Sequence, residues 1–595
     1  MCGVVATLGA AAAGAARLLA GVAHRGPDAS RLATDGPCTL GAARLRMVGD
    51  ARSDQPLRGP RGVLAAMNGE AFNHADFAPT ADGGSDLSAL LVALERDGAA
   101  ALDRVRGPFA VAWWDPAASE LVLARDPWGV RPLYVSADAR GVAAASEPWP
   151  LFEASGAAAR LDEAALAHLL AFQFPPPDRT LLRGVRPLAP GAVRRFRATA
   201  AGIVEAAAGR TAYAGPSEAD LAAALRSAAR LQGPATRRTA IFLSGGLDSS
   251  AVLGLLREAG CAPDLAFVGW FPEAGAGLDE RPHARAVAAA CRVPLVEVPI
   301  RAVDALEALP GVLRALGGPT AGPGSLSAAV LARAARDHGV DVVFTGQGGD
   351  ELYGGYERHR LLAALDRGEP LAPASGYEPL AAALAAAPDP LRAALVRGDA
   401  LRALLEPAAV VAMDAAVERA LPPAGPALVE RALAFERAVL LPGLLAVDDR
   451  TLAARGIEGR VPLLDPAAAR LAASTPWTET FPAGSPRRRL AGLAGAALPE
   501  PAARRRDKMG FPMPLGAWFR GPWRDAAYDL LAGDALTAFG FRRGAARAAF
   551  AAGALDPRTA WFLIALARFE SLAAELRARP SASARGARTS RAAAV

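Results

Sequence analysis

One run of residues constrains the fold of this chain more than any other feature. Residues 240–250 read Ala-Ile-Phe-Leu-Ser-Gly-Gly-Leu-Asp-Ser-Ser, and so pass from an apolar, strand-like stretch through two glycines into a helical pattern. Glycines let backbone N–H groups turn inward, serine hydroxyls add donors, and the positive end of the following helix faces the same point. The run therefore predicts an anion-binding loop between a strand and a helix, and phosphate is the anion that fits it best.

This loop differs from one that holds a terminal phosphate for transfer, because it lacks the Gly-Lys-Ser/Thr ending of a Walker A sequence. Ser-Gly-Gly-Leu-Asp-Ser-Ser resembles the signature of the N-type ATP pyrophosphatases, which adenylate a carboxylate or carbonyl group and release pyrophosphate. An ordinary corner between a strand and a helix is the alternative. Seven specified residues in the right context favour the pyrophosphate loop.

Strand-like and helical runs alternate around this loop. Strands are expected at 239–243, 265–271, 294–300 and 340–345, with helices up to residue 259 and through residue 290 between them. This rhythm is typical of an α/β doubly wound parallel sheet, whose ligands bind at the carboxyl ends of the strands. After Tyr356 the sequence turns almost wholly helical, which predicts a helical C-terminal region.

The first part of the chain has a different pattern. Short strand-like runs at 63–67, 109–114 and 120–124 alternate with Gly, Pro and Asp turns, which predicts a layered sheet enzyme with few helices. A chain of 595 residues exceeds what one core usually supports, so two domains are expected, at 1–205 and 216–575. The stretch 198–216 is the predicted linker, and 576–595 has the composition of a disordered Arg/Ala tail.

The composition limits the class of protein. Apolar residues make up 52% of the chain, yet no uninterrupted apolar run reaches the roughly 18 residues of a membrane span, and the N-terminus lacks a secretory signal pattern. The net charge of +6 is small for this length and much of it falls in the tail, so no nucleic acid partner is expected. The cysteines have no Cys-x-x-Cys spacing, which argues against zinc and disulfides and favours the cytoplasm. They are Cys2, Cys38, Cys261 and Cys291.

The N-terminus carries a candidate nucleophile. Met1 precedes Cys2, and a small residue at position 2 permits removal of the initiator methionine, which leaves the thiol beside a free α-amine. An α-amine titrates near about pH 8 and a thiol near about 8.5, so the amine can take the thiol proton without a histidine. A cysteine at this position is weak evidence when it stands alone.

The asparagines supply a second observation. Asparagine occurs only at Asn68 and Asn73, both within residues 67–73, which suggests a specific job for the side-chain amide. An oxyanion hole is such a job, because the amide N–H₂ of Asn68 and the backbone N–H of Gly69 can meet the charge of a tetrahedral intermediate, at about 2.7–4 kcal/mol per donor. A tight Asn-Gly hairpin turn is the alternative, and both can hold.

These motifs resemble, in order and along nearly the whole chain, those of the glutamine-hydrolysing asparagine synthetases. In the first half the resemblance rests on residues 1–5, 24–28, 44–45, 68–70, 85–86, 107–110, 124–134 and 145–147. In the second half it rests on residues 244–250, 346–356, 456–465 and 508–511. The resemblance implies a class II glutamine amidotransferase domain, an α+β sandwich of Ntn-hydrolase type, followed by an ATP pyrophosphatase domain.

The resemblance also implies roles for single residues of the first domain. It makes Cys2 the nucleophile that hydrolyses glutamine, with Asn68 and Gly69 as its oxyanion hole. A guanidinium fork suits the α-carboxylate of glutamine, and two acidic groups suit its α-amine. The glutamine-binding residues implied in this way are Arg44, Val48, Asn68, Gly69, Glu70 and Asp86.

The second domain is expected to bind ATP and Mg²⁺. Asp248 and Asp350 are the expected metal ligands, because Mg²⁺ takes one or two carboxylates together with phosphate oxygens. A solvated acidic pair of Asp350 and Glu351 is the alternative. The implied ATP-binding residues are Leu243, Ser244, Gly245, Gly246, Asp248, Ser249, Ser250, Val268, Thr345 and Gly346.

Two further residues bear on catalysis. Lys508 is the only lysine in the chain and stands among arginines, so this position needs a compact ammonium rather than mere positive charge; the resemblance places a catalytic lysine near this point. Gln347 departs from the pattern, because many family members have a glutamate there that is thought to assist formation of the acyl-adenylate. A glutamine cannot act as a base, although it can orient ammonia or the adenylate.

The leading hypothesis is amidation of aspartate, in which ammonia released from glutamine at Cys2 passes through the interior and attacks a β-aspartyl adenylate. In a second hypothesis the protein carries out the same two half-reactions but amidates another carboxylate, in cell-envelope or secondary-metabolite biosynthesis. A third, a non-catalytic nucleotide-binding or regulatory protein, is disfavoured by the intact candidate residues. The expected partners are small-molecule substrates, without nucleic acid or membrane, and a homodimer is left open.

Overall fold

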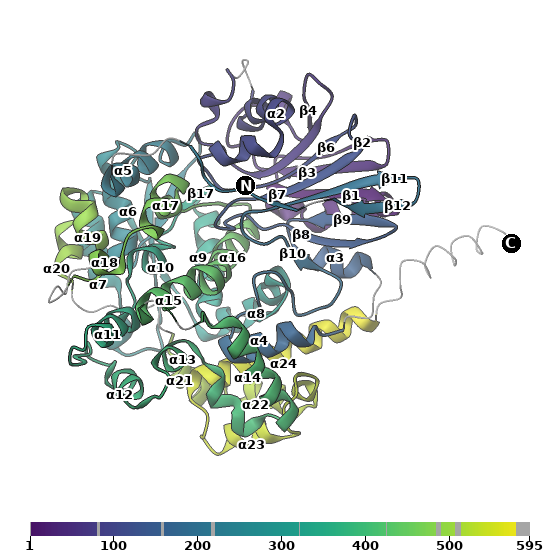
Figure 1. Ribbon diagram of the computed structural model, residues 1–595. Helices are drawn as coiled ribbons and strands as arrows, with labels where there is room; N and C mark the ends of the chain where they lie inside the picture. The colour runs from purple at the N-terminus through teal and green to yellow at the C-terminus, as the bar shows by residue number, and fades with distance from the viewer. Residues whose placement is uncertain are drawn as a thin grey trace.

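The computed structural model describes residues 2–79, 84–155, 160–206, 208–215, 220–319, 322–423, 425, 427–482, 489–505 and 513–578. Two parts are visible in Figure 1: an antiparallel β part, and a larger part in which helices surround a parallel sheet. We call them the N-terminal part, residues 2–215, and the C-terminal part, residues 220–578.

The N-terminal part contains two antiparallel sheets. Their strands are β1 (Cys2–Gly9), β2 (Ala29–Asp35), β3 (Cys38–Arg44), β4 (Leu57–Arg58), β5 (Leu64–Gly69), β6 (Phe109–Asp115), β7 (Glu120–Arg125), β8 (Tyr134–Asp138), β9 (Gly141–Ala145), β10 (Arg186–Pro187), β11 (Ala192–Thr199), β12 (Gly202–Glu205) and β13 (Gly209–Arg210). One sheet has the order β10-β8-β9-β1-β3-β2, and the other has the order β12-β11-β7-β6-β5-β4 with β13 beside β11.

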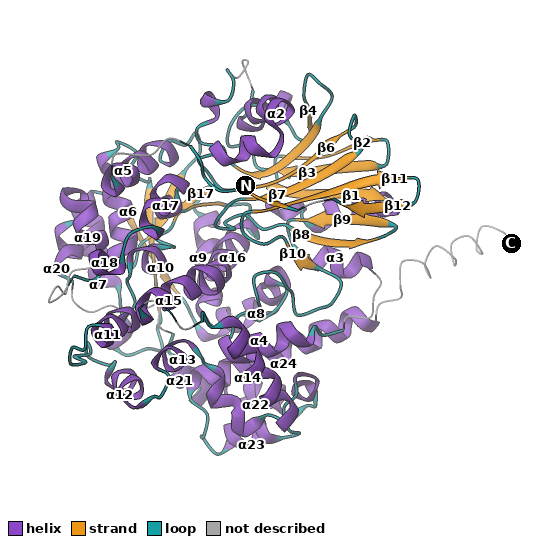
Figure 2. Cartoon of the chain, viewed as in Figure 1, coloured by secondary structure: helices purple, strands orange, loops and turns teal. Residues whose placement is uncertain are grey.

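The two sheets pack face to face between helices (Figure 2). Side chains of a strand point alternately to its two faces, and Val4 and Ala6 of β1 lie in the core between the sheets with Ala110 of β6. Helix α2 (Asp86–Asp97) covers the outer face of the β5–β6 sheet, and α1 (Ala15–Gly21) and α3 (Pro148–Ser155) cover the β1–β9 sheet. This helix–sheet–sheet–helix order confirms the predicted α+β sandwich of Ntn-hydrolase type.

The C-terminal part is built on a five-stranded parallel sheet. Its strands are β14 (Thr239–Phe242), β15 (Leu265–Trp270), β16 (Leu295–Pro299), β17 (Val342–Phe344) and β18 (Glu458–Arg460), in the order β16-β15-β14-β17-β18. Ala240 and Ile241, neighbours on β14, lie in different hydrophobic cores, one on each face of the sheet. The predicted doubly wound parallel sheet is confirmed. Its strand order reverses between β14 and β17, and ligands bind at such a switch point.

Helices cover both faces of this sheet and form the rest of the part. They are α5 (Leu221–Gln232), α6 (Leu247–Glu258), α7 (Arg281–Cys291), α8 (Ala302–Leu316), α9 (Gly324–Asp337), α10 (Gly349–Tyr353), α11 (Glu357–Asp366), α12 (Glu378–Ala386), α13 (Pro390–Leu395), α14 (Pro407–Ala420), α15 (Leu428–Phe435), α16 (Leu441–Ala453), α17 (Pro466–Ala473), α18 (Trp477–Thr480), α19 (Arg489–Ala494), α20 (Glu500–Arg504), α21 (Leu515–Arg520), α22 (Arg524–Ala532), α23 (Ala545–Ala551) and α24 (Pro557–Ala578). Helix α4 (Glu163–Phe172) belongs to the N-terminal part but packs on α14. Within the described residues, no helix combines the length and apolarity that crossing a membrane requires.

The structure corrects one expectation about organisation. Residues 198–205 are not linker, because β11 and β12 pair with each other there, and β13 extends the sheet to Arg210. The described region after Tyr356 is almost wholly helical, as expected, and β18 is the short strand that it adds to the parallel sheet beside β17. The disordered tail predicted at 576–595 lies almost entirely outside the described residues; the described residues 576–578 end α24.

Candidate active sites

Cys2 lies at the start of β1, opposite Arg44 of β3 in the antiparallel register. The residue is buried, and its backbone N–H donates to Asn68 Oδ1 of the other sheet at 2.9 Å. Burial raises the pKa of the Cys2 thiol, while a hydrogen bond from the Leu45 backbone and the Arg44 guanidinium pull it in the opposite direction. A thiol in this setting needs a base beside it to become nucleophilic.

The side chain of Asn68 faces this cysteine with one hydrogen-bonding atom unused. Asn68 is fully buried, and its Nδ2 has no hydrogen-bond acceptor among the described residues. The hairpin-turn alternative is wrong, because Asn68 and Gly69 end strand β5 and pair with Ala110 and Phe109. A buried amide donor without a partner costs free energy, so its retention beside a thiol suggests an acceptor that forms during reaction.

The backbone at Gly69 admits only glycine. Its φ is +141°, and a Cβ atom would lie 2.0 Å from the Pro108 carbonyl oxygen. The other asparagine, Asn73, has a structural environment instead: its Nδ2 donates to the Arg104 carbonyl at 3.0 Å, and its Oδ1 accepts from the Arg106 backbone at 2.7 Å. The two asparagines of the chain therefore differ in whether the amide donor is already used.

Two of the remaining predicted glutamine-binding residues, Arg44 and Asp86, lie near Cys2 with their side chains already engaged. Arg44 donates to Asp54 Oδ1 at 2.9 Å and to the Val48 carbonyl at 2.7 Å. Asp86 is buried at the start of α2, accepts from the Ala71 backbone at 2.9 Å, and has its pKa raised by burial. Sequence reasoning missed Asp54, which neutralises Arg44.

Glu70 points towards the C-terminal part. Its carboxylate accepts from Arg460 Nη2 of β18 at 2.7 Å, and Arg460 Nε also donates to Glu458 at 2.8 Å. All three side chains are buried. The structure thus pairs Glu70, predicted to hold the α-amine of glutamine, with an arginine of the other part.

A second buried ion-pair network joins the parts behind Cys2. Arg25 Nε donates to the Cys2 carbonyl at 3.1 Å, and its Nη atoms pair with Glu147 at 3.0 Å and with Asp449 of α16 at 2.7 Å. Arg131 also donates to Asp449, at 3.2 Å. Breaking a buried pair leaves an uncompensated charge, so these contacts fix the two parts against each other.

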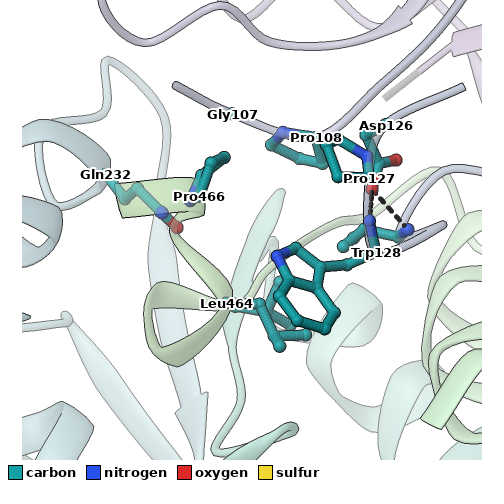
Figure 3. Close-up of a pocket in the computed structure, with 10 residues that line it drawn as sticks. Gly107, Pro108, Asp126, Pro127, Trp128, Gln232, Leu464 and Pro466 are labelled. Atoms are coloured by element: carbon teal, nitrogen blue, oxygen red, sulfur yellow. Dashed lines mark hydrogen bonds between the residues drawn. The ribbon is translucent and has the colours of Figure 1, made fainter. Parts of the chain in front are cut away.

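A small cavity lies where the two parts meet (Figure 3). Its volume is about 10 Å³, room for one water molecule, and its lining is mainly apolar. This is too small for a substrate. The lining residues come from both parts, and they are Gly107, Pro108, Asp126, Pro127, Trp128, Val130, Gln232, Val461, Leu464 and Pro466.

The predicted pyrophosphate loop follows β14 and leads into α6. Ser244 Oγ accepts from the Gly246 backbone at 3.2 Å, and Gly246 is the N-terminal cap of the 12-residue helix. Gly245 has φ +69°, and a Cβ there would lie 2.5 Å from the His283 carbonyl carbon. Arg505, which follows α20, also contacts the loop, because its Nη1 donates to the Ser244 carbonyl at 3.0 Å. The other predicted ATP-binding residues of this region, Leu243, Ser249, Ser250 and Val268, are buried around it.

The loop after β17 packs directly against the pyrophosphate loop. A Cβ on Gly346 would lie 2.7 Å from the Ser249 backbone nitrogen, and one on Gly349 would lie 2.7 Å from Asp248 Oδ1. The candidate residues after β14 and β17 therefore form one site at the switch point of the sheet. The two expected metal ligands, Asp248 and Asp350, stand in the first turns of α6 and α10, the helices that follow these adjoining loops.

The donor set fits a magnesium ion held together with phosphate. Two carboxylates at the starts of neighbouring helices would leave the other coordination positions of Mg²⁺ to phosphate oxygens and water, as this ion prefers. No group of three or more His, Cys, Asp or Glu side chains suited to a metal occurs among the described residues. The alternative of a solvated acidic pair does not fit Glu351, which is buried and accepts from the Tyr356 hydroxyl at 2.5 Å. Burial and the charge of Asp350 raise the pKa of Glu351 to about 8.

A carboxylate that sequence reasoning missed completes this site. Asp448 of α16 accepts from Thr345 Oγ1 at 3.0 Å and from Gln347 Nε2 at 3.2 Å. Burial raises the pKa of Asp448 to about 6. No local pattern could have revealed it, because it is about 100 residues from its partners. Lys508 lies outside the described residues.

Comparison with protein families gives a clear placement. A family described as asparagine synthase matches residues 220–574, which is more than half of the chain, and a glutamine amidotransferase domain matches residues 1–205. The chain belongs to the asparagine synthase family. As a member of this family, it is an ATP-dependent, glutamine-hydrolysing ligase.

Individual proteins similar to this chain include two named as asparagine synthetases. A protein of Mycobacterium tuberculosis, provisionally named a glutamine-hydrolysing asparagine synthetase, is 31% identical over 600 residues, covering 87% of this chain and 88% of the relative. Asparagine synthetase 1 of Bacillus subtilis is 28% identical over 57% of this chain and 55% of its own length. Amidase chry2 of Gibberella zeae is 27% identical over 57% of this chain and 54% of its own.

Proposed function

We propose that this protein transfers ammonia from glutamine to aspartate, with ATP converted to AMP and pyrophosphate. The observation that carries the proposal is a continuous set of contacts between two sites. Arg25 contacts the Cys2 carbonyl and Asp449, and the neighbouring Asp448 contacts the loop that packs on the pyrophosphate loop. A nucleophile for glutamine and a site for ATP are thereby joined through the interior of one chain.

At the first site, Cys2 is the proposed nucleophile. Removal of Met1 turns the backbone nitrogen of Cys2 into an α-amine, which Asn68 Oδ1 already holds at 2.9 Å. This amine takes the thiol proton, and the thiolate attacks the glutamine amide carbon. The unused Nδ2 of Asn68 and the Gly69 backbone N–H then stabilise the oxyanion. Arg44, Val48, Glu70 and Asp86 form the proposed pocket for the amino-acid end of glutamine.

At the second site, the loop of residues 244–250 is proposed to hold the phosphates of ATP. The turned backbone of Gly245, the Ser244 hydroxyl and the start of α6 suit an anion. Mg²⁺, held by Asp248 and Asp350, would neutralise phosphate charge. Lys508 is proposed to stabilise the adenylation or amide-forming transition state as a compact cation.

The alternative acceptor is a carboxylic acid other than aspartate. Two observations favour keeping it open: Gln347 stands where many family members have glutamate, and a relative named as an amidase matches more than half of the chain. The adenylation and amidation steps would be the same.

The test uses purified protein with ATP, Mg²⁺, either glutamine or ammonium, and candidate acids, with pyrophosphate release as readout. Aspartate should give pyrophosphate and asparagine in equal amounts. Cys2→Ala should abolish synthesis from glutamine but spare synthesis from ammonium. Equal loss of both activities would contradict the two-site division, and pyrophosphate release with another acid alone would establish the alternative acceptor.

A further inference from the structure

Gln347 raises a chemical question that the structure can answer. If a carboxylate is needed at this point of the synthetase site, another residue has to supply it, because an amide cannot take a proton at neutral pH. Among the described residues, the carboxylate that meets Gln347 is that of Asp448, at 3.2 Å from Nε2 to Oδ1. The other carboxylate oxygen accepts from Thr345 Oγ1, a predicted ATP-binding residue, at 3.0 Å.

Asp448 also lies on the helix that contacts the Cys2 site, where ammonia is proposed to be released. Its neighbour Asp449 pairs with Arg25 and Arg131 of the N-terminal part, and Arg25 holds the Cys2 carbonyl. Successive residues of an α-helix point about 100° apart, so α16 presents one carboxylate to each part. Asp448 is half-buried, whereas Asp449 is fully buried within its ion pairs. Asp448 is thus the less enclosed residue of this pair, and its carboxylate is held by neutral donors rather than by an arginine.

We propose that Asp448 supplies the carboxylate that position 347 lacks and is the base for amide formation. The nitrogen of ammonia forms a bond to the carbonyl carbon of the acyl-adenylate, and a proton passes from that nitrogen to a carboxylate oxygen of Asp448. The bond from the carbonyl carbon to the phosphate oxygen then breaks, and AMP leaves with the electron pair. Asp448 afterwards returns its proton to water.

The electrostatics of the site agree with this role. Burial raises the pKa of Asp448 to about 6, against hydrogen bonds from Gln347 and Thr345 that lower it, and the charge of Asp449 adds to the rise. The carboxylate is then still ionised at neutral pH, but it is a stronger base than an ordinary aspartate. General bases work best when their pKa lies near the operating pH.

The inference rests on the proposed function, and the experiment separates the two. It compares the wild type, Asp448→Asn, Asp448→Asn with Gln347→Glu, and Asp399→Asn as a control at an exposed carboxylate. L-Aspartate is the acceptor probe. Three activities are measured: amide formation from added ammonium, ATP–pyrophosphate exchange as a measure of adenylation, and hydrolysis of glutamine.

Asp448→Asn should lower the kcat of amide formation by about 10²–10⁴-fold, the usual contribution of a general base, and should change exchange and glutamine hydrolysis by less than about threefold. Adding Gln347→Glu should recover at least about tenfold of the loss, because its carboxylate would occupy neighbouring space. A merely structural Asp448 would not be rescued in this way. Asp399→Asn should match the wild type.

Four results would overturn the inference. Unchanged amide formation in Asp448→Asn would show that no base is needed there, and an equal loss of exchange would assign Asp448 to ATP binding or folding. If amide formation does not recover when Gln347→Glu is added to Asp448→Asn, a carboxylate at position 347 cannot replace that of Asp448. A wild type that forms no pyrophosphate with aspartate would overturn the proposed substrate together with the inference.

Discussion

The sharpest prediction for the first site concerns Asn68, whose two amide atoms have separable roles. Oδ1 accepts from the Cys2 backbone at 2.9 Å, and Nδ2 is buried without an acceptor among the described residues. Removing one oxyanion donor costs about 2.7–4 kcal/mol, so Asn68→Ala should lower the kcat of glutamine hydrolysis by about 10²–10³-fold. Glutamate release measures this loss.

The variant Asn68→Asp separates anchoring of Cys2 from stabilisation of the oxyanion. Aspartate keeps an oxygen acceptor for the Cys2 nitrogen but has no N–H donor, and it would set a negative charge beside the oxyanion. Its activity should therefore be no higher than that of Asn68→Ala. Recovery of glutamine hydrolysis in Asn68→Asp would show that Asn68 acts only as an anchor and would refute the oxyanion assignment.

Asn73 provides a matched control, because it is the other asparagine of the chain. Its amide is fully used, with hydrogen bonds to Arg104, Arg106 and Asp76. Asn73→Ala should lower the free energy of unfolding by about 1–3 kcal/mol, at about 1 kcal/mol per hydrogen bond, and leave the kcat of glutamine hydrolysis nearly unchanged. Synthesis from ammonium should survive in all three variants. A loss below about tenfold in Asn68→Ala would demote Asn68 to a structural residue.

Three further predictions concern the synthetase site, the interface and pH. Lys508→Arg should abolish synthesis from both glutamine and ammonium while sparing glutamine hydrolysis, because a planar fork misplaces the charge; near wild-type synthesis would remove Lys508 from catalysis. Asp449→Asn leaves two buried arginines without their shared carboxylate, so it should lower the free energy of unfolding, measured with urea, by about 3–5 kcal/mol. An unchanged urea midpoint would contradict this prediction. Burial alone would raise the pKa of Glu436, but His359 and Arg358 outweigh it and lower the pKa to about 2. The lowered pKa stabilises the fold by about 3 kcal/mol above about pH 4.5, and this stabilisation is lost as the pH falls towards 2. The difference in the free energy of unfolding between the wild type and Glu436→Gln, measured with urea, should therefore become smaller between about pH 4.5 and pH 2. A difference that stays constant down to about pH 3 would contradict the stabilising role of Glu436.

The parts of the fold that could be predicted from sequence are those set by local patterns. The strand at 239–242 and the helix from Leu247 follow from an apolar run, glycines and a helical period that are adjacent in the chain. Strand β18 was missed because Glu458–Arg460 has no apolar alternation. Its strand character comes from pairing with β17, which is more than 100 residues away, and from buried ion pairs that no local pattern contains.

In the candidate sites too, residues within local sequence patterns could be predicted, and contacts between distant residues could not. Cys2, Asn68 and the loop at 244–250 stand out from composition and spacing, and the structure brings Cys2 and Asn68 into contact. Glu70 was predicted to hold a substrate amine, and its pairing with Arg460 could not be foreseen, because a sequence does not show which buried carboxylate already has a partner. Asp448 was missed for the related reason that an aspartate in a helix usually faces solvent.

Helix α16 connects these findings, because its consecutive aspartates belong to different sites. Asp449 is bound by two arginines of the N-terminal part, while Asp448 is bound by the loop that follows β17. A helix of 13 residues is stiff, since each backbone hydrogen bond spans four residues, so a movement of its backbone at Asp449 carries Asp448 with it, whereas rotation of either side chain does not. Breaking the pair between Arg25 and Asp449 would leave buried charge uncompensated. A movement of α16 together with Arg25, which holds the Cys2 carbonyl, would keep this pair and would shift Asp448 relative to Gln347.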